Sequence, residues 1–74
     1  MNAEYGIEVG KRIKELRKAK GWTQEQLTAK MQLTGCDLTR SALAKIEVGQ
    51  RSVYPDEIKA LLEVFRISAE ELLP

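Results

Sequence analysis

Residues 21–27 are GWTQEQL, and this segment marks the end of one helix and the start of another. Gly21 is suited to end the first helix, because glycine tolerates the left-handed conformation that follows a last helical turn. Thr23 and Gln26 form a capping box, in which the threonine hydroxyl accepts a bond from a free amide and the glutamine reaches back. The segment therefore predicts a helix over about 24–33.

A second segment, TRSALAKIEVG at residues 39–49, predicts a short helix with two distinct faces. Thr39 is suited to cap this helix and Gly49 to end it, which gives a helix over about 39–48. At about 100° per residue, the inner face consists of Ala42, Leu43, Ile46 and Glu47. The opposite face consists of Arg40, Ser41, Ala44 and Lys45.

The segments on either side also carry apolar residues at helical spacing, and none alternates as a strand would. Before residue 21, a stripe of Val9, Ile13 and Leu16 predicts a helix over about 7–20. After residue 49, Pro55 suits the first position of a helix over about 55–65, whose stripe consists of Ile58, Leu61, Leu62 and Phe65.

Ser68 and Glu71 form another capping box, which predicts a last short helix over about 69–73. The stretch between the second and third helices contains turn residues and no periodic stripe. We therefore predict an all-α chain, folded as one compact domain of five helices over residues 1–74.

Length and composition exclude several classes of function. The chain has 74 residues, one cysteine and no histidine, which excludes an internal disulfide and the usual zinc or haem ligands. We expect no metal and no cofactor. A chain this short offers little concave pocket, so we expect neither an enzyme nor a small-molecule ligand. It has no export signal and no apolar run that could span a membrane, so we expect a cytoplasmic protein without a membrane partner.

The segments at 21–27 and 39–51, GWTQEQL and TRSALAKIE-x-G-x-R, resemble the Cro/repressor-type helix-turn-helix family, also called the xenobiotic-response-element family. The resemblance covers about 9–73. It implies a five-helix repressor-like domain in which the second and third helices form the helix-turn-helix. The third helix would enter the major groove of double-stranded DNA.

Position by position, the resemblance assigns base contacts to Arg40, Ser41, Ala44 and Lys45. Their chemistry suits base edges, because arginine bonds guanine bidentately, lysine reaches guanine or phosphate, and alanine permits close approach. We expect phosphate contacts from helix starts and from the polar loop after the third helix, at Gln24, Thr39, Gln50, Arg51 and Ser52. The alternative for all of them is an ordinary solvated surface. We expect Lys11, Lys14 and Lys18 to be such a surface of the first helix.

The chain departs from the family pattern between the second and third helices. The stretch from Met31 to Thr39 is about five residues longer than usual, so either the second helix gains a turn or the connection bulges. Thr28 also replaces the usual alanine where the two helices cross. Cys36, within the connection, is expected to be an inert thiol.

Arg17 and Glu47 each border an apolar stripe, where an unpaired charge is costly. The family resemblance implies a salt bridge between them that joins the first and third helices.

These features predict a transcriptional repressor that binds an operator and acts by occupying a promoter. The alternative is a protein-interaction module on the same fold, such as an antitoxin, but the basic third helix favours DNA. One recognition helix covers too few base pairs to select a genomic site, so we expect a homodimer on an inverted repeat. The predicted dimer interface consists of Ile67, Leu72 and Leu73.

Overall fold

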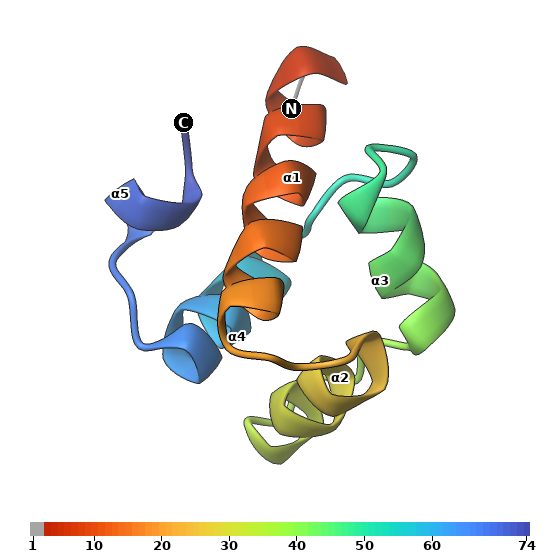
Figure 1. The fold of residues 1–74 in the computed structure, drawn as a ribbon, viewed down its shortest axis with the longest axis vertical. Coiled ribbons are helices and arrows are strands. Elements are labelled where there is room, and N and C mark those ends of the chain that lie inside the picture. Colours follow the sequence, from red (N-terminus) through yellow and green to blue (C-terminus); the bar gives the residue numbers. More distant parts are fainter. Residues whose placement is uncertain (1–2) are drawn as a thin grey trace.

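The computed structural model describes residues 3–74, which form five α-helices and no strand (Figure 1). The helices are α1 (Ala3–Ala19), α2 (Gln24–Leu33), α3 (Arg40–Glu47), α4 (Pro55–Phe65) and α5 (Ala69–Leu72). The prediction of an all-α, five-helix fold with α2 and α3 as the helix-turn-helix is confirmed. α1 begins at Ala3 rather than near residue 7. α3 is shorter than predicted, because Thr39 and Val48 are its capping residues.

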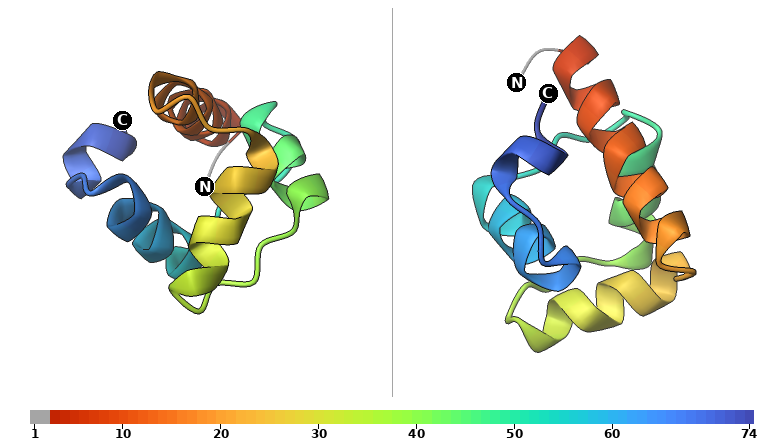
Figure 2. Two further views of the ribbon diagram at one scale, coloured as in Figure 1. Left: turned by 60° about the horizontal axis from the view of Figure 1, so that its bottom comes forward. Right: turned by 60° about the vertical axis from the view of Figure 1, so that its left-hand side comes forward.

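α1 lies in the middle of the molecule. Figure 1 shows it between α5 and α3, with α2 crossing below its C-terminal end, and the two further views in Figure 2 agree. α1 packs against α3 and α5, and α2 packs against α3 and α4. α3 is therefore supported from behind by both α1 and α2, and its other side is left free.

Four helices end with the same hydrogen-bonding motif, around a residue with a positive φ. These residues are Gly21, Gly35, Gly49 and Arg66. In each case the next amide donates to a carbonyl five positions earlier: Trp22 to Arg17 at 3.1 Å, Cys36 to Met31 at 3.1 Å, Gln50 to Lys45 at 2.8 Å and Ile67 to Leu62 at 3.1 Å. These bonds satisfy carbonyl groups that have no partner inside the helix.

Residues 34–39 connect α2 to α3 and contain no helix. α2 ends at Leu33, as predicted, so the connection is a separate, non-helical segment. Cys36 and Leu38 are only 9% and 5% exposed, and both belong to the apolar core. The long connection is thus held against the protein by two buried side chains.

The core takes side chains from all five helices. The most deeply buried are Val9, Ile13, Leu27, Met31, Leu43, Ile46, Leu61, Phe65 and Leu72. Trp22 is half-buried at the edge of this core and stacks on Phe65, with ring centroids 5.7 Å apart. Leu72 is 0% exposed, so the prediction that it contributes to a dimer interface is wrong. It is the apolar anchor by which α5 is attached to the core.

Gly10 sets the distance between α1 and α3. A Cβ atom at this position would collide with the carbonyl oxygen of Ile46 and would approach the backbone of Glu47. Only a residue without a side chain lets the two helix backbones come this close. The position of α3 relative to α1 therefore depends on this glycine.

We predict that Gly10→Ala destabilises the protein. In an exposed helix this substitution gains up to about 1 kcal/mol of helix propensity. Here the added methyl group must push α3 away, and overpacking of this kind costs about 1–3 kcal/mol. Urea unfolding measures the difference. A variant as stable as the wild type, or more stable, would contradict the close approach of the two helices.

Candidate nucleic-acid interface

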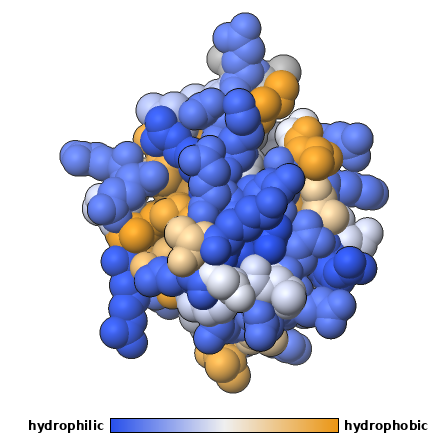
Figure 3. All heavy atoms as spheres, viewed as in Figure 1, coloured by the Kyte–Doolittle hydropathy of each residue, from blue (hydrophilic) through white to orange (hydrophobic). Residues whose placement is uncertain are grey.

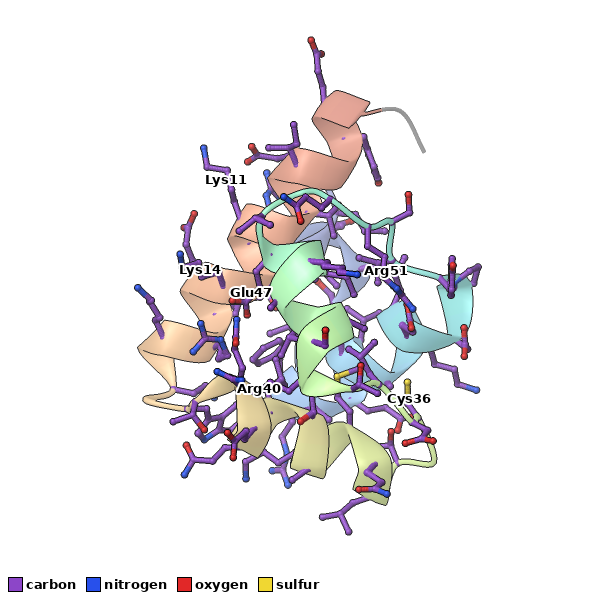
Figure 4. All side chains as sticks on the ribbon, turned by 90° about the vertical axis from the view of Figure 1, so that its right-hand side faces the viewer. Lys11, Lys14, Cys36, Arg40, Glu47 and Arg51 are labelled. Carbon is purple, nitrogen blue, oxygen red and sulfur yellow. The ribbon has the colours of Figure 1, made fainter. Side chains whose placement is uncertain are left out.

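The polar face of α3 is accessible from solvent. Arg40, Ser41 and Lys45 are exposed and Ala44 is partly exposed, whereas Leu43, Ile46 and Glu47 on the other side are buried. Figure 4 views the molecule from this side, with α3 in front and α1 beside it. The four residues predicted to contact bases thus lie on one surface that nothing in the described chain covers.

Arg40 makes one ion pair, with Glu25 of α2. The two charged groups are 3.6 Å apart, and their side chains are 65% and 76% exposed. Such an exposed pair stabilises by at most about 1 kcal/mol, so it does not prevent Arg40 from binding another acceptor.

Behind α3, the predicted partners Arg17 and Glu47 meet in a bidentate ion pair. Arg17 donates from Nε to Glu47 Oε2 at 2.7 Å and from Nη2 to Oε1 at 3.0 Å. The third guanidinium nitrogen, Nη1, donates to the Trp22 carbonyl at 2.8 Å. Both residues are buried, at 8% and 4% exposure. The carboxylate of Glu47 raises the pKa of Arg17, and this effect outweighs the opposing effect of burial.

Gln24 joins the same cluster from the start of α2. Its Nε2 donates to Glu47 Oε1 at 3.1 Å. The sequence predicts a phosphate contact here, and an amide NH₂ group has a second hydrogen to donate. The first amides of α2 also lack partners within the helix, as at any helix N-terminus. Gln24 is therefore oriented by Glu47 and keeps one donor available.

Arg51, another predicted phosphate contact, is held within the protein. Its guanidinium donates to both carboxylate oxygens of Glu57, at 2.9 and 2.8 Å, and to the carbonyl of Ser52 at 2.8 Å. It also lies over the ring of Tyr54, 4.4 Å from the centroid, and its side chain is only 24% exposed. Arg51 is not the freely projecting cation that the loop composition suggested.

Glu57 is the residue that the sequence analysis missed. It is 6% exposed, and besides binding Arg51 it accepts a bond from the Tyr54 amide at 2.9 Å, which caps α4. Burial raises its pKa, but the bonds from Arg51 and Tyr54 outweigh burial and hold the pKa below its usual range. The available signal was its position three residues after Tyr54, where an acidic side chain can cap a helix start.

Burial raises the pKa of the Cys36 thiol, and the neighbouring carboxylates, Glu57 first among them, raise it further, while Arg51 opposes them. The thiol therefore stays protonated at neutral pH and is a poor nucleophile.

The remaining predicted residues divide into three groups. Gln50 and Ser52 are exposed in the loop after α3. Thr39 is exposed too, but its hydroxyl accepts the Ala42 amide at 3.1 Å and so caps α3. Ile67 and Leu73 are partly buried against the core, which leaves part of each accessible.

Residues 13–72 match the sequence profile of the helix-turn-helix family. The chain belongs to the helix-turn-helix family. Its members are DNA-binding proteins, and the chain is accordingly a DNA-binding transcriptional regulator. No curated protein sequence matches it significantly.

Two solved structures are similar to this helix-turn-helix protein. The restriction-modification controller protein C.AhdI from Aeromonas hydrophila is 36% identical, with a TM-score of 0.78 over 90% of this chain and 94% of that one. The DNA-binding domain of BldD shares the fold, at 20% identity and a TM-score of 0.80 over the full length of both chains. Within residues 3–74, no helix is long and apolar enough to cross a membrane, and no acidic, cysteine or histidine cluster could hold a metal ion.

We predict strong coupling between Arg17 and Glu47. Replacing either by alanine leaves the other charge buried without a partner, which costs about 3–5 kcal/mol of unfolding free energy. The double variant should therefore lose much less than the sum of the two single losses. Urea unfolding of the four proteins gives the coupling energy.

The exposed pair Arg40 and Glu25 provides a matched control. The same cycle of alanine variants there should give a coupling below about 1 kcal/mol. Equal coupling energies for the two pairs would show that burial of the Arg17–Glu47 pair has no energetic consequence.

Proposed function

We propose that this helix-turn-helix protein binds an operator in double-stranded DNA, with α3 in the major groove, and represses transcription by occupying a promoter. The observation that carries the proposal is the face of α3. Arg40, Ser41, Ala44 and Lys45 are accessible there on a helix whose opposite side is held by a buried ion pair. A rigid helix with a forked cation, a hydroxyl and a small methyl group suits the donor and acceptor pattern of base edges.

Phosphate contacts are proposed at the start of α2 and in the loop that follows α3. At the first place, Gln24 would use its second amide hydrogen, beside the amides of the α2 N-terminus. At the second, Gln50 and Ser52 are exposed in the loop after α3. We assign Arg51 to shaping this loop through Glu57 rather than to a direct contact, because both of its terminal nitrogens already donate to Glu57 or Ser52 and its side chain is only 24% exposed.

Alanine substitutions should separate base contacts from phosphate contacts. Arg40→Ala and Lys45→Ala should each reduce the preference for a selected operator over random duplex by about 1–3 kcal/mol. Gln24→Ala and Gln50→Ala should weaken binding to both duplexes similarly. Fluorescence anisotropy at several salt concentrations measures both effects. A wild-type affinity for DNA that does not change with salt would contradict the proposed function itself.

We further propose a two-fold dimer on an inverted repeat, with the two copies of α3 about 34 Å apart. Among the three residues expected at its interface, Ile67 and Leu73 remain candidates because they are partly accessible. Both lie towards the C-terminal end, and Figure 1 shows α5 on the other side of α1 from α3. A partner bound to this surface would leave the polar face of α3 free.

Leu73→Asp should abolish cooperative occupation of the inverted repeat, since it introduces a charge into the proposed interface. Leu33→Asp is the control, because Leu33 is 89% exposed at the far end of α2. Stoichiometry on the selected site, measured by sedimentation of the complex, should be two chains for the wild type and the control. One chain per site for the wild type would end the dimer proposal.

A further inference from the structure

We infer that three lysines of α1, Lys11, Lys14 and Lys18, form a second phosphate-binding surface beside the groove that α3 would occupy. This inference rests on the proposed function, and it names a part of the DNA-binding surface that the motif does not include. The three residues are called the lysine row below. They were expected to be an ordinary solvated surface, and the packing of α1 against α3 gives them a different role.

The contacts of α1 fix the direction in which the lysine row faces. Gly10 lies against the backbone of α3, and Arg17 binds Glu47 of α3, so these two residues mark the side of α1 that is turned to α3. Lys14 is four residues after Gly10 and three before Arg17, which makes it a surface neighbour of both. In Figure 4, Lys11 and Lys14 extend from the outer edge of α1, and they are visible from the same side of the molecule as Arg40.

The lysine row is exposed and its charges are available. Lys11, Lys14 and Lys18 are all exposed, and the ion pairs formed within residues 3–74 include none of them. By contrast, Arg12 of the same helix is paired with Glu8 at 3.5 Å. Glu8 and Glu15 lie one turn from members of the row, but helical spacing places them on the side further from α3. Lys14 is thus the member of the row nearest to α3, and Lys11 and Lys18 lie further round on the flank of α1, between α3 and the acidic side.

The dimensions of the lysine row match a DNA strand. Seven residues separate Lys11 from Lys18, which corresponds to about 10 Å along a helix. Neighbouring phosphates of one strand are further apart than their rise of about 3.4 Å along the duplex axis, because the strand winds around that axis, so a row of this length reaches about two of them. The row ends at Lys18, six residues before α2 begins at Gln24, where Gln24 and the first amides of α2 would hold a phosphate. The lysines would continue the contact along that same strand.

The salt dependence of binding tests this inference. Each lysine that neutralises a phosphate contributes about 0.9 to the slope of log affinity against log salt. Lys14→Ala with Lys18→Ala should therefore reduce the slope by about 2, equally for the selected operator and for random duplex. Lys59→Ala, an exposed lysine of α4, is the matched control and should leave the slope unchanged.

The outcomes separate this inference from the proposed function. Thermal unfolding of the variants should match the wild type, because the substituted side chains are exposed. If the wild type binds DNA and the double variant has the slope of the Lys59→Ala control, the lysine row is not a phosphate surface and the proposed function stands. The inference would also be overturned if the double variant had a changed preference for the operator over random duplex and an unchanged salt slope. If the wild type binds no duplex, both proposals fail together.

Discussion

The bidentate pair between Arg17 and Glu47 is the interaction on which the helix-turn-helix, formed by α2 and α3, depends. It joins the C-terminal part of α1 to the last turn of α3, and through the Trp22 carbonyl and Gln24 it also includes the turn that begins α2. Three separate segments are thus oriented by one carboxylate and one guanidinium. Burying two charges is costly, and an apolar pair of the same volume is often as stabilising. The main role of this pair is therefore to fix the position of α3 relative to α2, and its contribution to the net free energy of folding is smaller.

A second ion pair lies close to the first, in the loop that follows the same C-terminal end of α3. Arg51 and Glu57 lie across the loop that links α3 to α4, and Glu57 also caps α4 through the Tyr54 amide. The loop leaves α3 at Gly49 in a defined direction because both of its ends are bonded. The C-terminal end of α3 and the loop that follows it are thus attached by a buried and a half-buried arginine, and both arginines bind carboxylates of the protein itself. The polar side chains that remain exposed are those of Lys45, Gln50 and Arg40, and the one ion pair of Arg40, with Glu25, is itself exposed.

Helix positions were the part of the fold that could be predicted from the sequence. The Thr23 capping box and Pro55 are local signals, and the helices that they begin were placed correctly because a cap depends only on its neighbours along the chain. The buried pair at Arg17 could be anticipated because a charge beside an apolar stripe needs a partner. Leu72 was assigned wrongly, since an apolar residue near a chain end has the same appearance in the sequence whether it faces the core or a second subunit.

Arg51 and Cys36 show what local patterns leave open. The polar composition of the loop suggested free donors, but the conformation of the loop brings Arg51 to Glu57, and only the tertiary structure shows that both terminal nitrogens of Arg51 donate to this carboxylate. Cys36 lies in a segment without periodicity, and its burial follows from its place beside α4, where it lines one pocket with Lys59 and Ala60.

The ion pairs within the protein also determine where positive charge remains on its surface. The net charge of +1 argues neither for nor against a nucleic-acid partner. Once Arg17 and Arg51, which bind buried carboxylates, are set aside, exposed cations remain on α1 and α3, and Figure 4 shows Lys11, Lys14 and Arg40 from one side of the molecule. Pairing inside the protein thus separates cations that position the recognition helix from those that can attract a phosphate strand, and this separation, rather than the total charge, gives the domain one surface suited to DNA.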